Sequence, residues 1–328
     1  MTMIPTHVQF NHIVAFDVGK EALVIHVLPG DIRHTIPNTA KAVAQVLRQE
    51  KKRNAKDKLG PLLVVCEATG GYERHVLDGA ISLGLACHRA HGTRVRYFAK
   101  YKGLLAKTDP MDARVIALFG RQTEDLRRYE PPGPDETALR DLKVRRDQIQ
   151  GMMIAEGNRL EQARHASVTK SIKAHINGLQ KAIDALEAEI EALLNASETL
   201  APKARLMRSV KGVGVVTVSA VLAHMPGIGT YSKAQVAALA GLAPINNESG
   251  NTHLPRHTQA GRSAIRRTLY MAALVAKTCN PVMKAFAADL KARGKPFKVI
   301  IVAVMRRLLV ILNAVVRSGE PWKGAQNA

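Results

Sequence analysis

A chain of 328 residues, 46% of them hydrophobic, is long enough to fold into two or three domains with buried cores. Its 48 lysines and arginines outnumber 27 acidic residues, and the net charge of +21 indicates a polyanionic partner such as nucleic acid. Aromatic residues are only 4% of the chain, which excludes base stacking as the main binding device, and three widely separated cysteines exclude a disulfide scaffold and indicate a reducing cytoplasm.

The first third of the chain alternates short apolar runs with helical stretches. Strands are predicted at residues 12–16, 22–28, 32–36, 61–66 and 85–89, and helices at residues 39–50 and 72–83. Asp17 follows the first strand, and Glu67 follows the fourth, which is apolar throughout and is predicted to be buried on both faces. Carboxyl ends of neighbouring strands meet at one edge of an open α/β sheet, so we expect both acids where ligands gather.

The segment 107–113, Lys-Thr-Asp-Pro-Met-Asp-Ala, contains the start of another helix. Asp109 is predicted to be its N-cap, Pro110 its first residue and Asp112 its third. Residues three apart share a helix face, so the two carboxylates can hold one divalent cation. They can also act only as caps, because the helix dipole favours negative side chains at this end. Taken alone, the segment favours the capping role.

Four acids, Asp17, Glu67, Asp109 and Asp112, would repel one another at one sheet edge unless metal ions neutralised them. A pair of Mg²⁺ ions satisfies this requirement and is suited to phosphoryl transfer. The stretch before the acid pair is basic, with aromatic residues between the cations, and is expected to contact nucleic acid. Its cations are Arg94, Arg96, Lys100, Lys102 and Lys107.

Three segments of this region resemble the N-terminal domain of the DEDD insertion-sequence transposases, a family that includes the pilin-gene invertase and the bridge-RNA-guided recombinases. The segments are Ala-Phe-Asp-Val-Gly-Lys at 15–20, Cys-Glu-Ala-Thr-Gly-Gly-Tyr-Glu at 66–73, and 107–113. The resemblance implies a RuvC-like, ribonuclease-H-type α/β fold. It also implies metal binding by Asp17, Glu67, Asp109 and Asp112, in preference to capping alone.

Beyond a linker, Pro-Pro-Gly-Pro at 131–134, the chain is predicted to be helical, first at 135–164 and then as a heptad repeat. The repeat consists of Ile172, Ile176, Leu179, Ile183, Leu186, Ile190 and Leu193. It fits either an antiparallel hairpin within one chain or a coiled coil between chains. Alternating Ile and Leu favour the pairing between chains, and so a homo-oligomer, a dimer or tetramer.

The last third begins with a Gly-x-Gly turn, Gly212 to Gly214, between two short helices. This resembles a helix-hairpin-helix, whose backbone N–H groups approach phosphate, although a plain helix turn fits equally well. No Asp or Glu occurs from residue 249 to residue 288, while six Lys and Arg do. A helix at 261–276 is therefore expected to face phosphates with three of these cations. They are Arg262, Arg266 and Arg267.

Ser249 lies in a Glu-Ser-Gly sequence, which by itself is ordinary turn chemistry. Gly-Leu-Ala-Pro at 241–244, Ser-Gly at 249–250 and Gly-Arg-Ser-x-Ile-Arg-Arg from residue 261 resemble the C-terminal domain of the same family. In that domain the serine is the nucleophile that attacks DNA, so the resemblance implies this role for Ser249. Family members often carry more Lys and Arg than Arg-His-Thr-Gln at 256–259, so fewer phosphate contacts are expected there.

Together these features predict a RuvC-like catalytic domain at 1–130, a coiled-coil helical region at 131–198, and a mainly α transposase domain with a helix-hairpin-helix-like element at 199–328. The resemblance implies a Mg²⁺-dependent transposase or recombinase that mobilises an insertion sequence by cutting and rejoining donor and target DNA, with a bridge RNA choosing the sites. The alternatives are a RuvC-like nuclease that hydrolyses DNA with activated water, and a basic nucleic-acid-binding scaffold without catalysis.

The most apolar segment, residues 297–316, carries Arg306 and Arg307 near its centre. Two arginines at that depth would be costly in a bilayer, so the segment is predicted to be a buried amphipathic helix. No signal peptide is visible. We therefore expect no membrane partner and a location in the bacterial cytoplasm, associated with the nucleoid.

Overall fold

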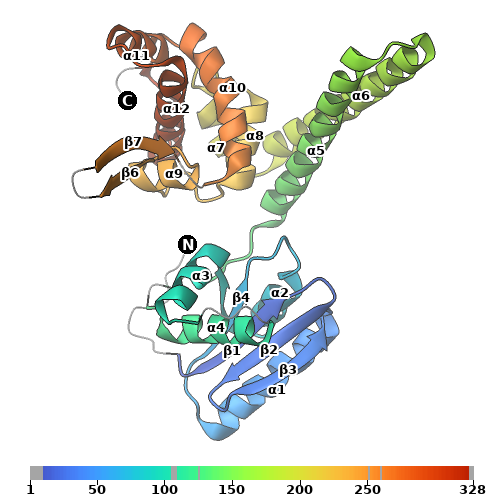
Figure 1. Ribbon diagram of the computed structural model, residues 1–328, viewed down its shortest axis with the longest axis vertical. Coiled ribbons are helices and arrows are strands. Elements are labelled where there is room, and N and C mark those ends of the chain that lie inside the picture. The colour runs from blue at the N-terminus through green and yellow to red at the C-terminus, as the bar shows by residue number, and fades with distance from the viewer. Residues whose placement is uncertain (1–9, 105–108, 125, 250–251, 259–260, 325–328) are drawn as a thin grey trace. The chain divides into compact units, whose positions relative to one another are not determined.

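The computed structural model describes residues 10–104, 109–124, 126–249, 252–258 and 261–324, without the side chains of 109–111, 245–249 and 252–257. The chain divides into an N-terminal unit, residues 1–131, and a C-terminal unit, residues 132–328 (Figure 1). The boundary lies in the proline-rich segment that was predicted to be a linker. Each unit has its own hydrophobic core.

The N-terminal unit is built on a mixed sheet of five strands in the order β3-β2-β1-β4-β5. The strands are β1 (His12–Val18), β2 (Ala22–Leu28), β3 (Ile32–Pro37), β4 (Leu62–Glu67) and β5 (Ala86–Ala90). β1, β2 and β3 pair antiparallel, and β4 joins β1 and β5 in parallel. This sheet with its helices fits the α/β fold of a RuvC-like domain, as predicted.

Helices cover both faces of this sheet. They are α1 (Ala40–Asp57), α2 (Arg74–Ser82), α3 (Gly92–Tyr101) and α4 (Asp109–Gln122). Alternate strand residues such as Phe16 and Cys66 pack with α1 and α2, whereas Ala15 and Val65 share a core with α3 and α4. Because both faces are buried, β1 and β4 are apolar almost throughout.

The helix α4 lies close against its sheet face. A Cβ atom on Gly120 would come within 2.7 Å of Val65 Cγ2 and 3.5 Å of Ile13 Cγ2. Only a residue without a side chain allows this approach, since real Cβ contacts are essentially never under 3.0 Å. The glycine therefore fixes the depth at which α4 sits on β1 and β4.

The C-terminal unit starts with two long helices, α5 (Pro134–Gln162) and α6 (Ala166–Ala196), which lie side by side as a hairpin (Figure 1). The rest is mainly helical, with one two-stranded antiparallel sheet. Its elements are α7 (Ala201–Arg208), α8 (Val215–His224), α9 (Lys233–Leu239), β6 (Pro244–Ser249), β7 (Thr252–Thr258), α10 (Ser263–Cys279), α11 (Pro281–Ala292) and α12 (Phe297–Ser318).

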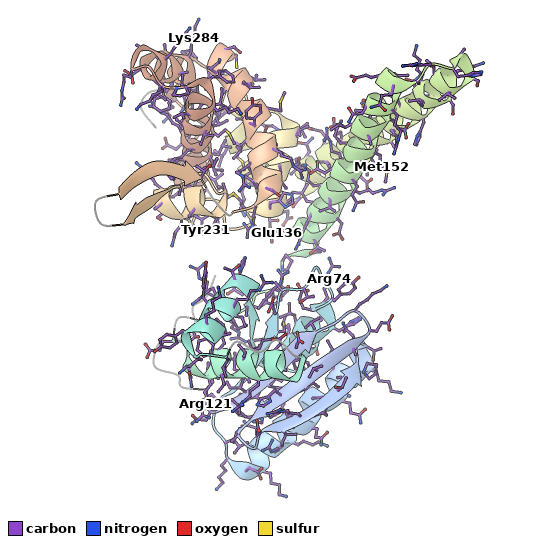
Figure 2. The ribbon with its side chains drawn as sticks, viewed as in Figure 1. Arg74, Arg121, Glu136, Met152, Tyr231 and Lys284 are labelled. Carbon is purple, nitrogen blue, oxygen red and sulfur yellow. The ribbon has the colours of Figure 1, made fainter. Side chains whose placement is uncertain are left out.

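The heptad repeat of α6 is only partly buried within the chain, since Ile172, Ile176, Leu179, Leu186 and Leu193 are half-buried. Ile183 and Ile190 are each 2% exposed, and α5 contributes Leu139 and Ile149 as its own buried residues. Within the chain, α5 and α6 form the antiparallel hairpin, which is one of the two interpretations of the repeat. The oligomer itself stays a prediction. Met152 on α5, labelled in Figure 2, and Ile154 remain 48% and 58% exposed.

The Gly-x-Gly turn before α8 packs against α10. Gly212 has φ +93°, and a Cβ atom there would lie 2.8 Å from the Cα atom of Ala276. Asn280 Nδ2 also donates to the carbonyl of Lys211 at 3.1 Å. The glycine at this turn is therefore needed for close packing of the turn on α10, and both interpretations of the turn remain open.

The apolar segment near the C-terminus forms α12. Among the residues that the structure describes, it is the one helix long and apolar enough to cross a membrane, and more than half of its apolar window is buried. Ile301, Val304 and Leu308 lie in the core of the C-terminal unit. The guanidinium of Arg307 lies 4.6 Å from the ring centroid of Phe286. These contacts agree with the prediction of a buried core helix.

Candidate active site

Strand register places Asp17 and Glu67 beside each other. Phe16 pairs with Cys66 in the parallel ladder of β1 and β4, so the next residue on each strand is one of the two acids. Side chains alternate along a strand, which puts Asp17 and Glu67 on the same face as Ala15 and Val65. That face is the one covered by α3 and α4. Both acids are half-buried at the carboxyl ends of neighbouring strands, as predicted from sequence.

The carboxylate of Glu67 lies against the first residue of α3. A Cβ atom on Gly92 would overlap Glu67 Oε1 and would lie 3.0 Å from the carboxyl carbon. His91 is the N-cap of this helix, and its Nδ1 accepts from the backbone N–H of Thr93 at 3.2 Å. The N-terminal end of α3, where the helix dipole is positive, therefore lies against the Glu67 carboxylate.

A second acid, Glu73, organises the loop that follows β4. Its side chain is 2% exposed, accepts from the backbone N–H of Thr69 at 3.1 Å and of Gly71 at 2.8 Å, and forms an ion pair with Arg89. Burial opposes ionisation, but the backbone hydrogen bonds and the Arg89 guanidinium outweigh it, so the pKa of Glu73 is lowered. Sequence reasoning did not single out Glu73, although it ends the Cys-Glu-Ala-Thr-Gly-Gly-Tyr-Glu segment.

The other two predicted acids are on α4. Asp109 is the first residue of this helix and Asp112 the fourth, so they share a face as expected, although Asp109 was predicted to precede the helix. α4 contacts β1, β2 and β4, on the face to which Asp17 and Glu67 belong. The Asp112 side chain is half-buried, whereas that of Asp109 lies outside the described residues.

Oxygen ligands of this kind suit Mg²⁺. Among the side chains that the structure describes, no three His, Cys, Asp or Glu come close enough together to hold a metal ion. Asp17 and Glu67 therefore lie at one edge of the sheet, but Asp112 does not come close enough to form a group of three with them, and the side chain of Asp109 lies outside the described residues.

The predicted basic segment forms α3 and the residues after it. Arg96, Lys100 and Lys102 are exposed on this helix and its C-cap, while the Arg94 guanidinium lies 5.6 Å from the ring centroid of Phe119. Lys107 lies outside the described residues. The exposed cations are thus on the same helix whose first residue contacts Glu67.

Ser249 belongs to the other unit of the chain. It is the last residue of β6 and pairs with Thr252 of β7 across the hairpin, and its side chain lies outside the described residues. The four acids and the serine are therefore supplied by two separate compact units.

The three predicted arginines differ in their surroundings. Arg262 is the N-cap residue of α10, and its Nη1 donates to the carbonyl of His224 at 2.5 Å, which satisfies a free carbonyl at the end of α8. Arg266 is half-buried and Arg267 is exposed. Arg262 is exposed as well, but its guanidinium already has a structural hydrogen bond.

Both units match protein-family models. Residues 14–167 match the DEDD model of an IS110-type transposase, and residues 204–288 match the model described as the transposase IS116/IS110/IS902 family. The first match contains all four predicted acids, and the second contains Ser249 and the arginines of α10.

Similar proteins include two with the name pilin gene-inverting protein, from Moraxella lacunata and Moraxella bovis. Each is 29% identical over 268 residues, which cover 80% of this chain and 82% of the relative. A protein of the insertion element IS110 in Streptomyces coelicolor is 31% identical over 167 residues, covering 49% of this chain and 39% of the relative. With both units matched, this chain belongs to the IS110-type family of insertion-sequence transposases, which are enzymes that cut DNA.

Proposed function

We propose that this transposase cuts and rejoins donor and target DNA through a covalent link to Ser249, with Asp17, Glu67, Asp109 and Asp112 as the metal-binding acids. The observation that supports this most directly is the register of β1 and β4, which sets Asp17 and Glu67 side by side at the edge of the sheet. α4 lies over the same face and begins with the other two acids.

In this mechanism the Ser249 hydroxyl attacks a backbone phosphorus of DNA. A bond forms between serine Oγ and phosphorus, the bond to one deoxyribose oxygen breaks, and the serine proton ends on the released hydroxyl. Mg²⁺ held by the four acids supplies charge stabilisation for the phosphate oxygens. Attack by a new DNA hydroxyl on the phosphoserine reverses the step, so strands are rejoined without a nucleotide cofactor.

Because the acids and the serine belong to two units, the active enzyme must bring the β6–β7 hairpin of one unit to the sheet edge of another. We propose that a homo-oligomer, a dimer or tetramer, achieves this on DNA. A bridge RNA that pairs with donor and target would choose the sites, because a protein with a net charge of +21 binds phosphate backbones without reading sequence.

The competing function is hydrolysis of DNA by the N-terminal unit with water as the nucleophile. It is favoured by one observation, that all four acids belong to a single unit. The two functions differ in a covalent intermediate, since only the serine mechanism links protein to DNA.

The test is a denaturing gel of the full chain with Mg²⁺, a bridge RNA and end-labelled substrate DNA. We expect a protein–DNA adduct that resists denaturant, is lost in Ser249→Ala, and is lost together with cleavage in Asp17→Asn. The neighbouring substitution Thr258→Ala, in the same hairpin, is the control and should keep the adduct. Cleavage by Ser249→Ala at the wild-type rate, with no adduct in any variant, would establish the hydrolytic enzyme instead.

A further inference from the structure

The outward face of α3 carries two exposed tyrosines one turn apart. Tyr97 is 66% exposed and Tyr101 is 82% exposed. The opposite face holds the helix to the unit through Val95, which is 5% exposed, and through Phe98, whose ring meets the ring of Phe119 edge to face at 5.7 Å. The helix is therefore anchored without either tyrosine.

Two exposed rings on one short helix are unusual for this chain. It contains six tyrosines among 328 residues, and aromatic residues are only 4% of the total. Aromatic side chains gain most from burial, so packing does not account for two of them pointing outward here. Residues four apart are neighbours on a helix surface, so the rings of Tyr97 and Tyr101 can act on one ligand.

The charged residues of the segment that carries these rings are all positive. Residues 91–108 contain five Lys and Arg and no Asp or Glu. Arg96 and Lys100 precede the two tyrosines along the helix, and Lys102 Nζ lies 5.5 Å from the ring centroid of Tyr101. Cations beside exposed aromatic rings are the combination that binds single-stranded nucleic acid, where cations contact phosphates and rings stack on bases.

The position of the rings ties them to the proposed site. α3 begins at Gly92, in contact with Glu67, so Tyr97 and Tyr101 lie about 7–8 Å and about 13–14 Å further along the helix axis, at about 1.5 Å per residue. A strand whose phosphate is at the acids can therefore reach both rings within a few nucleotides.

We propose that Tyr97 and Tyr101 form a stacking platform for unpaired bases next to the cleavage site. The inference rests on the proposed function, which has nucleic acid as its substrate. It adds that the bases of this substrate are unpaired where it meets the platform. In a duplex each base face is covered by its neighbours, so the rings can engage only bases that have left the stack. The platform thus favours a locally opened strand at the acids, while exposed cations elsewhere bind duplex by its phosphates.

The experiment measures binding in EDTA, so that no cleavage is needed for the result. Fluorescence anisotropy of the full chain is recorded with four labelled 12-mers, namely single-stranded DNA, the same sequence as RNA, abasic single-stranded DNA and duplex DNA. Variants are Tyr97→Leu and Tyr101→Leu, which keep apolar bulk, and Tyr97→Phe and Tyr101→Phe, which keep the ring. Phe297→Leu is the control, because Phe297 is 52% exposed on a helix of the other unit.

Each Leu variant is expected to bind single strands about tenfold more weakly, which corresponds to about 1.4 kcal/mol, while each Phe variant binds like wild type. The difference between Leu variants and wild type should vanish with abasic DNA, and duplex binding and the control should be unchanged. Of the single-stranded DNA and the RNA 12-mers, the one whose binding is weakened more by the Leu substitutions is the kind of strand that uses the platform.

Unchanged single-strand binding in both Leu variants would overturn the platform. An equal loss of affinity for duplex or abasic DNA would also overturn it, and so would Phe variants that bind as weakly as the Leu variants. These outcomes leave the proposed function intact as long as Ser249 still forms its adduct. A wild-type chain that binds none of the four nucleic acids would instead contradict the proposed function itself.

Discussion

The carboxyl carbon of Glu67 lies 3.0 Å from the point where a Cβ atom would be placed on Gly92. One of these residues ends β4 and the other begins α3, so a predicted catalytic acid and the start of a basic helix are in direct contact. No other residue fits at position 92 without moving the carboxylate or the helix.

Gly92→Ala is therefore expected to reduce Mg²⁺-dependent DNA cleavage by at least about tenfold, because a misplacement near 1 Å at a reacting group is enough for such a loss. Circular dichroism should show a folded chain. Gly151→Ala is the matched control, since Gly151 is in α5 with nothing within 4 Å of its added Cβ, and it should leave cleavage unchanged. Equal activity of the two variants would show that the contact between Gly92 and the Glu67 carboxylate is not needed for cleavage.

Asp109→Asn and Asp112→Asn are each expected to lower cleavage by about a hundredfold or more, as for loss of a preorganised charged group, and to leave DNA binding nearly unchanged. The measurement is strand cleavage over a Mg²⁺ titration, with binding by anisotropy. Glu124→Gln, an exposed acid beyond the other end of α4, is the control. Full cleavage by both Asn variants would leave only helix capping for these two acids.

Glu73→Gln is expected to destabilise the protein by about 3 kcal/mol at pH 7, because it leaves Arg89 without its buried partner. The pKa of Glu73 is lowered on folding, so its contribution is present above the ordinary carboxyl pKa and is lost as the pH falls through the lower folded pKa. Urea unfolding at a series of pH values should show the difference between wild type and variant narrowing as the pH falls below the ordinary carboxyl pKa and towards the lower folded one. A constant difference at every pH would contradict the assignment.

Substitutions of two isoleucines test whether a second copy of the chain packs on the α5–α6 hairpin. Ile190 on α6 is 2% exposed, and Ile154 on α5 is 58% exposed. Ile190→Ala is expected to cost about 2–5 kcal/mol of unfolding free energy, whereas Ile154→Ala should stay within about 0.5 kcal/mol. If Ile154→Ala also costs several kcal/mol and lowers the mass seen by light scattering, a second copy covers this side of the hairpin.

Arg262 and Arg267 are expected to differ in their effect on DNA binding. Arg267→Ala should lower the slope of log affinity against log salt by about 0.9 on duplex DNA, as one phosphate contact is lost. Arg262→Ala should instead lower the unfolding temperature with little change in slope, because it removes the hydrogen bond to the carbonyl of His224. The reverse pattern would show that Arg262 faces the phosphates and that Arg267 does not.

Much of the N-terminal unit was predictable from local pattern. The continuous apolar run before Glu67 predicts a strand that is buried on both faces, and the structure has this strand at Leu62–Glu67. The β6–β7 hairpin was not predicted, because its strand residues include two asparagines and two prolines and lack a clear alternation of apolar and polar side chains. α1 is longer than expected, since its last two turns are mostly charged and show no apolar period.

The sequence by itself identified the family, because the acids, the serine and the cations stand in segments that match its models. Tertiary structure alone decided which of them meet. The one-residue register between β1 and β4 brings Asp17 to Glu67, and a shift by one would have turned one of them to the other face. Likewise the packing of α6 on α5 is seen only in three dimensions, because the heptad pattern fits a partner helix from the same chain or from another.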